Sequence, residues 1–285
     1  MQAVETKGEA KEALKRIAAQ ADDAVDIAEA ALLLAALDHP TTDLTLYREH
    51  LREIADGVHD KAGEAGLGDA PAPEDMAEVL RAVLADQFRY AGDDETYDDL
   101  DNANLMRVIE RRRGLPVSLG ILYIAAARAQ GWAAVGLNFP KHFLVRLESK
   151  DGRRAIVDPF HRGRTMGAPE LRELLKITAG PGVELEAGHY RPVATRDVLV
   201  RLQNNIKSRN LDRGQLDAAA EAVDRMLLLD PANAGFWREA GVIHMRAGHL
   251  KRSIASFEQF LAHAENGPDW DKIARVVAEL RDRIN

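Results

Sequence analysis

The segment that decides the fold is Ser118–Gln130, which reads Ser-Leu-Gly-Ile-Leu-Tyr-Ile-Ala-Ala-Ala-Arg-Ala-Gln. Its apolar residues fall on every side of a helix, a pattern typical of a buried helix rather than an amphipathic surface helix. Further along, the pair Asp151-Gly152 predicts the tight turn of a β-hairpin. A buried helix followed by an antiparallel meander indicates an α+β domain. Three strand-like runs precede and follow that turn: Ala133–Phe139, His142–Glu148 and Ala155–Asp158.

Residues 1–92 are expected to form a helical region that packs on this domain. The apolar cluster within Ile27–Leu37 predicts one helix, in an alanine-rich stretch that favours helix formation. After a loop predicted at Ala65–Pro73, Glu74 and Asp75 favour a new helix start, because acidic residues stabilise a helix N-terminus. Between these two, a helix predicted to begin after Asp43 has one apolar face, at spacings of three and four residues: Leu44, Tyr47, Leu51, Ile54 and Val58.

Residues 93–195 are expected to form the α+β domain itself. The domain opens with an acidic loop, Asp93–Asp99, followed by a short predicted helix over Asn102–Arg113 that ends at Gly114. The basic triplet Arg111–Arg113 has the charge to bind phosphate. We favour the alternative that it pairs with the acidic loop or stabilises the helix C-terminus.

No cofactor or metal site is expected. Counted from Asp94, the sixth and twelfth positions of a calcium-binding EF-hand would be Asp99 and Leu105, where that motif requires Gly and Glu. The nine histidines include no H-E-x-x-H or other zinc spacing. Neither G-x-G-x-x-G nor a P-loop occurs.

Residues 196–285 repeat at a spacing of 34, which aligns Arg213–Leu216 with Ala247–Leu250. The second unit has residues where a tetratricopeptide helix carries its W-x2-L-G-x2-Y pattern. We therefore expect α-helical tetratricopeptide-like repeats, capped by a last helix over Asp271–Arg283. The alternative is a generic pair of helical hairpins. The residues at the motif positions are Trp237, Ala240, Gly241 and His244.

Composition narrows the class of protein. The chain has 285 residues, a net charge of −8 and 46% apolar residues, which is ordinary for a globular protein of about two domains. Its acidic balance disfavours a dedicated nucleic-acid or anionic-membrane binder, and no apolar run is long enough to span a bilayer. No secretory signal is visible, and there is no cysteine. We expect a cytoplasmic protein; the oligomeric state stays open.

Three residues of the α+β domain form a candidate catalytic set. Ser118 opens the buried helix, His142 begins the second predicted strand and Asp158 ends the third. A serine, a histidine and an aspartate can supply a nucleophile, a base and an orienting carboxylate. Each also has a simpler explanation, as a helix N-cap, a structural histidine and a turn residue before proline. A purely structural hydrogen-bond network of the three is a further alternative.

Three motifs carry a resemblance to a known family. They are residues 110–119 (Glu-Arg-Arg-Arg-Gly-Leu-Pro-Val-Ser-Leu), residues 138–146 (Asn-Phe-Pro-Lys-His-Phe-Leu-Val-Arg) and residues 157–160 (Val-Asp-Pro-Phe). In this order and spacing they resemble the bacterial SirB-type family, a branch of the transglutaminase-like superfamily that often carries C-terminal tetratricopeptide repeats. The similarity extends from about residue 30 to the end. It implies a papain-like α+β core, with the central helix packed on an antiparallel sheet.

The resemblance also implies where a catalytic site would lie. Active transglutaminase-like enzymes place a cysteine at the start of the central helix, a histidine on the next strand and an aspartate on the one after. By motif, these positions are Ser118, His142 and Asp158. Asn138 is a candidate oxyanion donor, and His161 and Arg162 are candidates for the lining of the same cleft.

The serine at the nucleophile position divides the functional hypotheses. A helix N-terminus and an imidazolium can ionise a thiol near neutral pH, whereas a dipole effect of roughly 0.3–2 kcal/mol cannot ionise a hydroxyl. We therefore favour a protein without thiol catalysis that binds a peptide or protein partner through its cleft and its repeats. The alternative is a serine-dependent amidase or peptidase that uses Ser118, His142 and Asp158.

Overall fold

A computed structural model describes residues 6–39 and 41–284 of the chain. The chain divides into two compact units, Met1–Leu199 and Val200–Asn285, and the division falls inside the helix α8 (Thr195–Asp212). The domain boundaries predicted at residues 92 and 195 stay predictions. Within the described residues, no helix has the length and apolar character needed to cross a membrane.

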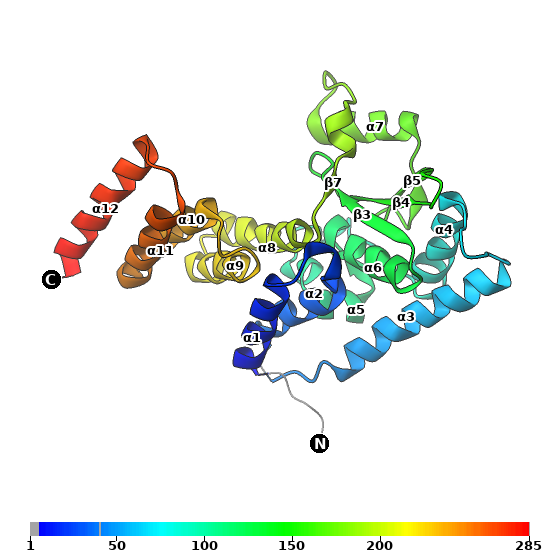
Figure 1. Cartoon of the computed structure of the whole chain (residues 1–285), viewed down its shortest axis with the longest axis horizontal. Coiled ribbons are helices and arrows are strands. Elements are labelled where there is room, and N and C mark those ends of the chain that lie inside the picture. The colour runs from blue at the N-terminus through cyan, green and yellow to red at the C-terminus, as the bar shows by residue number, and fades with distance from the viewer. Residues whose placement is uncertain (1–5, 40, 285) are drawn as a thin grey trace. The chain divides into compact units, whose positions relative to one another are not determined.

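The first unit begins with helices, which come before its strands in the chain (Figure 1). Thr6 and Glu9 cap the first helix reciprocally, and the Asp26 side chain caps the second. The predicted loop ends one residue early, because Pro73 takes the first position of its helix, where a missing N–H costs nothing. That helix continues as a π-helical segment, Arg81–Gln87. The first α-helices, in chain order, are α1 (Lys7–Ala18), α2 (Ile27–Ala36), α3 (Thr45–Glu64) and α4 (Pro73–Leu80).

The predicted helix over residues 102–113 is wrong in both of its limits. Asn104 caps α5 (Leu105–Arg111), its side chain accepting from the N–H groups of the next turn, and a separate 3-10 turn precedes it over Leu100–Ala103. Arg112 ends the helix in the left-handed region at φ 58°. The next two residues form β2 (Arg113–Gly114), which pairs in parallel with β1 (Ala91–Gly92).

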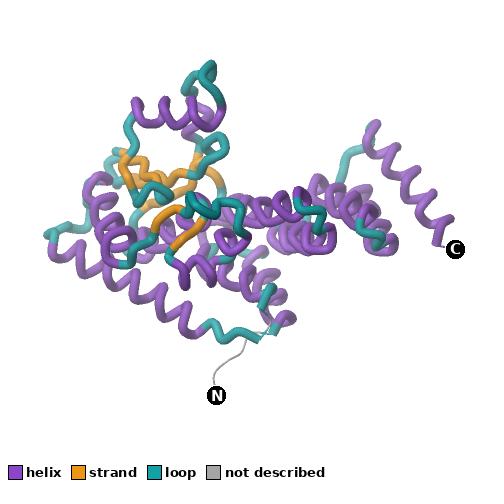
Figure 2. Tube along the Cα trace, turned by 180° about the vertical axis from the view of Figure 1, so that it is seen from behind, coloured by secondary structure: helices purple, strands orange, loops and turns teal. Residues whose placement is uncertain are grey.

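The buried helix and the antiparallel sheet confirm the α+β prediction. Helix α6 (Pro116–Ala129) packs on two neighbouring strands of a five-stranded sheet with the order β6-β5-β4-β3-β7 (Figure 2). Gly120 of α6 and Gly136 of the sheet sit so close to the Phe143 ring that a Cβ on either would lie 2.4 Å from it. The strands are β3 (Ala133–Leu137), β4 (Leu144–Glu148), β5 (Arg154–Asp158), β6 (Arg164–Thr165) and β7 (Pro192–Val193); α7 (Ala168–Ala179) precedes β7.

His142 does not begin a strand, contrary to the prediction. The segment between β3 and β4 is a turn in which His142 N–H donates to the Phe139 carbonyl at 3.1 Å, with Lys141 at φ 53°. The predicted hairpin is present, since β4 and β5 pair with Val145 opposite Val157. The turn before β4 and the end of β5 therefore lie side by side, which positions the site.

The second unit is a run of antiparallel helices with the predicted repeat. Gly214 and Gly248 lie at matching positions of the repeat and have φ of 69° and 80°. Each follows the end of the first helix of its repeat. The last helix packs through Ile273, Val277 and Leu280 on the preceding one, as expected of a cap. It begins at Pro268, earlier than predicted. The helices after α8 are α9 (Leu216–Leu229), α10 (Ala234–Arg246), α11 (Leu250–His263) and α12 (Pro268–Ile284).

Candidate functional site

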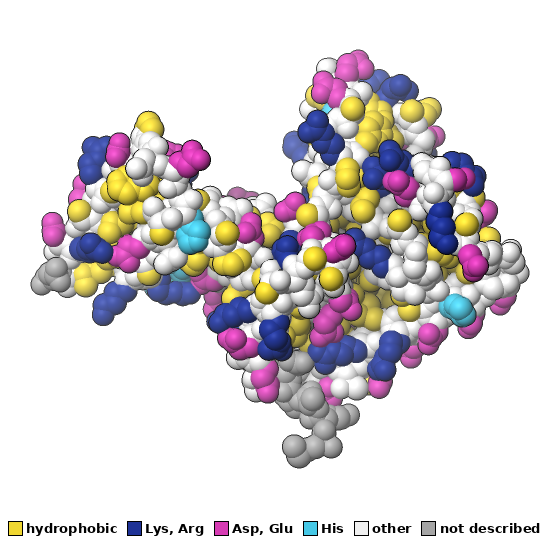
Figure 3. Space-filling view, in the orientation of Figure 1, with side chains coloured by type: hydrophobic (Ala, Val, Ile, Leu, Met, Phe, Trp, Pro, Cys, Tyr) yellow, Lys and Arg dark blue, Asp and Glu magenta, His cyan; other side chains and the backbone are white. Residues whose placement is uncertain are grey.

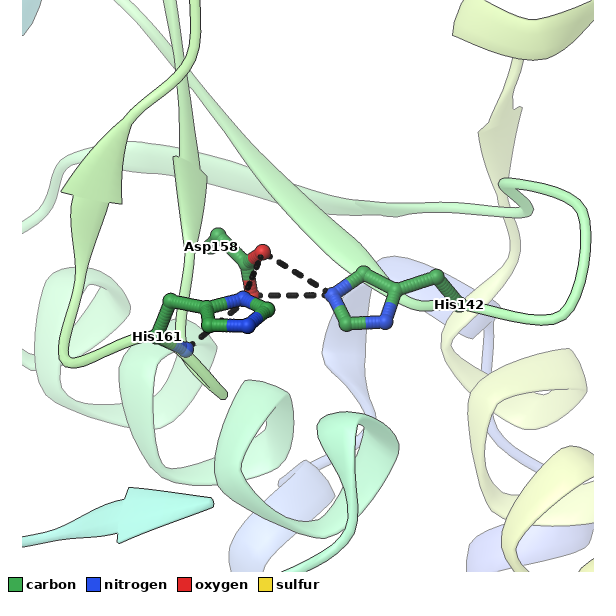
Figure 4. Close-up of side chains that lie close together, drawn as sticks. All are labelled: His142, Asp158 and His161. Atoms are coloured by element: carbon green, nitrogen blue, oxygen red, sulfur yellow. Dashed lines mark hydrogen bonds and ion pairs between the residues drawn. The ribbon is translucent and has the colours of Figure 1, made fainter. Parts of the chain in front are cut away.

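His142 and Asp158 form a buried pair (Figure 4). His142 Nε2 lies 2.9 Å from Asp158 Oδ1 and 3.0 Å from Oδ2. The histidine comes from the turn before β4 and the aspartate from the last position of β5. Asp158 is 0% exposed and His142 is 6% exposed, so the pair is shielded from solvent. The carboxylate thus fixes the orientation of the imidazole.

A second histidine, His161, binds the same carboxylate. His161 Nδ1 lies 2.7 Å from Asp158 Oδ2, and its ring stacks near that of His142 with the centroids 5.8 Å apart. A tight turn after β5 brings His161 close to Asp158. In this turn Arg162 and Gly163 have φ of 59° and 72°, and the Gly163 N–H donates to the Asp158 carbonyl. Unlike its partners, the His161 side chain is 56% exposed.

Asp158 is an anion that its neighbours stabilise. Burial by itself raises the pKa of this carboxyl, but hydrogen bonds from His142 and His161 outweigh burial and lower the pKa to about 2. The Phe160 and His161 N–H groups add bonds of 3.1 and 3.3 Å to Oδ1. In turn, the hydrogen bond to Asp158 raises the pKa of His161.

The Phe160 ring forms an apolar wall beside both histidines. Its edge-on contacts have centroid distances of 6.0 Å to His142 and 5.3 Å to His161. A Cβ at Gly92 would lie 2.5 Å from this ring, so only glycine leaves room for it there. Tyr97 packs edge-on against the same ring, with a centroid distance of 5.9 Å. The Phe160 ring is therefore held in place beside the two histidines.

Ser118 is held by main-chain carbonyls. Its Oγ lies 2.8 Å from the Asn102 carbonyl oxygen and 3.0 Å from that of Leu115, so the hydroxyl proton is directed at those acceptors. The residue is 0% exposed. It is not an N-cap: Leu115 occupies that position, Pro116 begins α6, and Ser118 is the third helical residue. Its hydroxyl donates to the backbone, whereas an N-cap hydroxyl accepts.

The loop whose Asn102 carbonyl accepts the Ser118 hydrogen bond is itself held by side-chain contacts. Asn102 Nδ2 donates to the Thr96 carbonyl at 2.7 Å, and Arg111 Nη1 donates to Asn102 Oδ1 at 3.2 Å. Arg111 also forms an ion pair of 2.9 Å with Asp93. Pairing of the basic triplet with the acidic loop is thus confirmed for Arg111. Although burial raises the pKa of Asp93, the Thr96 bonds, the Asn102 bond and the Arg111 charge bring it to about 2.

Two other predicted residues lie at the edges of this region. Asn138 is exposed in the segment after β3, and its role as an oxyanion donor stays a prediction. Arg162 donates to the Ala85 carbonyl at 3.0 Å and also lines a pocket of about 740 Å³, next to His161. The pocket carries charges of both signs. Its full lining is residues 91–96 together with Arg111, Arg113 and residues 160–162.

Comparison with known proteins places the chain in a family. The sequence model described as "Transglutaminase-like superfamily" matches residues 45–204, and one for the tetratricopeptide repeat matches residues 206–278. The chain is 34% identical over 243 residues to the UPF0162 protein of Xylella fastidiosa strain 9a5c, with 84% of each chain covered. The chain belongs to the SirB-like branch of the transglutaminase-like superfamily.

Other relatives extend the comparison. The chain is 26% identical over 258 residues to the UPF0162 protein of Vibrio cholerae, covering 90% of this chain and 93% of that one. It is also 28% identical over 156 residues to human F-box only protein 21, covering 52% of this chain but only 24% of the human one. The matches to the bacterial proteins therefore include the repeats as well as the core.

The structure adds residues to this SirB-like site that the sequence did not single out. His161 appeared only as a candidate for the cleft lining, yet it binds Asp158 directly. The sequence signal available for this contact is the Asp-x-x-His spacing directly after the end of β5. The Asn102 carbonyl had no signal, because it lies sixteen residues from Ser118 and meets it only through the fold.

Proposed function

We propose that this SirB-like protein is a peptide- or protein-binding module without thiol catalysis. One observation carries the proposal: the Ser118 hydroxyl is buried and donates to the carbonyls of Asn102 and Leu115. A nucleophilic hydroxyl has to pass its proton to a base as it attacks the substrate. Here the hydrogen bond from the hydroxyl links the start of α6 to the loop that contains Asn102, which is a structural role.

The chemistry of the substituted position also supports this proposal. The full sequence contains no cysteine, so no thiol can replace the missing nucleophile. A serine at a helix N-terminus stays protonated, because the dipole contributes roughly 0.3–2 kcal/mol against the high pKa of a hydroxyl. The scaffold of an ancestral enzyme can then serve as a recognition surface.

Two features supply surfaces for a partner. The pocket beside Phe160 and His161 has a volume of about 740 Å³, in the range that binds a few peptide side chains. Helical repeats stack into surfaces that bind extended partners. On the face shown in Figure 3, Lys and Arg are interspersed with Asp and Glu, a mixed pattern that fits a polypeptide better than a polyanion.

A selection from a phage-displayed peptide library on the full chain tests the binding role. Selected peptides are then measured by fluorescence anisotropy against variants. Arg113→Glu reverses an exposed charge in the pocket and should weaken binding about tenfold. Arg191→Glu, an exposed position outside the pocket lining, and Ser118→Ala should both bind as the wild type does. A library that yields no peptide above the background of an unrelated bait contradicts the proposal.

The second candidate function is a serine-dependent amidase or peptidase. The observation that favours it is the buried pair of His142 and Asp158, which would hold a catalytic base in orientation. This candidate predicts turnover of a peptide or amide panel that both Ser118→Ala and His142→Ala abolish. Turnover that survives Ser118→Ala rules out the serine mechanism.

A further inference from the structure

The side chains of His142, Asp158 and His161 converge in a way that the binding role does not use. The ligand atoms of His142, Asp158 and His161 all lie within 4.8 Å of one another (Figure 4). We propose that these residues form a site for a divalent transition-metal ion of the zinc class. The proposal goes beyond the peptide-binding role and does not depend on it.

The distances fit a small adjustment to a metal centre. Tetrahedral zinc with bonds of about 2.0–2.1 Å sets its ligand atoms roughly 3.3 Å apart. The two nitrogen-to-oxygen contacts are now 2.9 Å for His142 and 2.7 Å for His161. In each contact the ring nitrogen faces the carboxylate. To hold one metal ion in place of the two hydrogen-bonding protons, the nitrogen-to-oxygen distances would lengthen by about 0.4–0.6 Å, and all three ligand atoms, now within 4.8 Å of one another, would take this common spacing.

Groups behind the ligands hold them in place. The N–H groups of Phe160 and His161 donate to Asp158 Oδ1, which orients the carboxylate as outer-shell hydrogen bonds do in metal sites. Left-handed residues fix both turns, Lys141 beside His142 and Arg162 beside His161. The three ligands therefore come from a rigid frame rather than from a loose surface cluster.

The exposure of His161 leaves a path for a metal ion to enter and room for a further ligand. Asp158 is buried, but the His161 side chain is 56% exposed and lines the pocket of about 740 Å³. The same pocket carries Asp94 and Glu95, which favour entry of a cation, opposed by the arginines in its lining. A fourth ligand from solvent or from a bound peptide can complete the coordination on this side.

The donor set selects the class of metal. Two imidazole nitrogens and one carboxylate are ligands of zinc, cobalt and iron(II), whereas calcium and magnesium require mostly oxygen donors. The sequence has no zinc motif because His142 reaches the cluster from a different turn, sixteen residues before Asp158.

The test is titration of the full, untagged chain with Co²⁺, whose visible absorption reports a tetrahedral site, followed by displacement with Zn²⁺. We expect one ion per chain at micromolar concentration, and binding at least about tenfold weaker in His161→Ala. His161 is exposed enough for that variant to fold, which circular dichroism checks. His59→Ala removes an exposed histidine elsewhere and should change nothing. Absence of a visible band, or equal binding by His161→Ala, overturns the proposal.

Discussion

His142 Nε2 lies almost equally far from the two oxygens of Asp158, at 2.9 and 3.0 Å, although sixteen residues separate them in the chain. In a transglutaminase-like fold this pair would orient a base towards a nucleophile. Ser118, which we predict to lie at the nucleophile position of that fold, instead donates to the main-chain carbonyls of Asn102 and Leu115. The proposal that Ser118 has a structural role beside an ordered His142–Asp158 pair leads to specific predictions.

Ser118→Ala should lower the stability of the protein. The substitution removes the hydrogen bond that the buried hydroxyl donates to the Asn102 and Leu115 carbonyls, at a cost of about 0.5–1.5 kcal/mol, because both carbonyls still accept a backbone N–H, from Leu115 and Leu119. Urea unfolding followed by circular dichroism measures the free energy of unfolding. Ser208→Ala removes an exposed hydroxyl and should stay within about 0.5 kcal/mol of the wild type. Equal stability of the Ser118→Ala variant would mean that the hydroxyl has no structural role.

Gly114→Ala should destabilise the protein through Ser118. A Cβ at this position would lie 2.6 Å from Ser118 Oγ and 3.0 Å from a Val108 methyl, an overpacking that costs roughly 1–3 kcal/mol. Removing the hydroxyl relieves the closer contact, so Gly114→Ala combined with Ser118→Ala should cost less than the sum of the two. Gly63→Ala, which meets nothing within 4 Å, is the matched control. If the destabilisation of the double variant equalled the sum of the two single changes, the predicted contact between residues 114 and 118 would be wrong.

Acid should remove a stabilising contribution of Asp158. Its pKa is lowered from 3.8 to about 2, because the hydrogen bonds from His142 and His161 outweigh burial. A depressed pKa stabilises the folded state above the unfolded value, and this is lost as the pH falls from about 4 to about 2. The loss amounts to roughly 2 kcal/mol. The difference in unfolding free energy between the wild type and Asp158→Asn should shrink over this range, while that for the exposed Asp94→Asn serves as reference.

His161 should make the unfolding free energy depend on pH near neutrality as well. Its hydrogen bond to Asp158 raises its pKa above 6.5, so its contribution is complete below that pH and is lost as the pH rises through the folded value. The unfolding free energy of His161→Ala should therefore approach that of the wild type above this range. A constant difference between the two proteins from acid to alkaline pH would contradict the assignment.

Ser118→Cys would create the only thiol of the chain. Because the position is 0% exposed and its side chain is held by carbonyls, we expect iodoacetamide to alkylate the folded protein at least about tenfold more slowly than the urea-unfolded one. Ser208→Cys, at an exposed position, should react at similar rates in both states. Rapid alkylation of folded Ser118→Cys that is lost with His142→Ala would reveal an activated nucleophile position.

The sequence predicts the frame of the site better than its contacts. All-round apolarity locates α6, and the Asp151-Gly152 turn brings β4 and β5 together, which places His142 near Asp158. These are local signals of periodicity and turn chemistry. The strand predicted from His142 fails because Lys141 takes a left-handed conformation that arginine and lysine rarely adopt.

The missed details depend on tertiary structure. Pro116 occupies the first turn of α6, which moves Ser118 from the expected cap to the third helical position. Its acceptor, the Asn102 carbonyl, comes from a separate loop that only the fold brings near. His161 turns back on Asp158 through a left-handed Arg162, and the sequence does not mark that conformation. Catalysis depends on such contacts, so motif similarity alone cannot assign it.

The most direct measurement is intact-protein mass spectrometry after incubation with a fluorophosphonate serine probe. If the Ser118 hydroxyl is structural, folded wild-type protein will gain no label at Ser118 under conditions that fully label a known serine hydrolase. A stoichiometric adduct that peptide mapping places on Ser118, and that His142→Ala abolishes, would contradict the account and establish a serine-dependent enzyme.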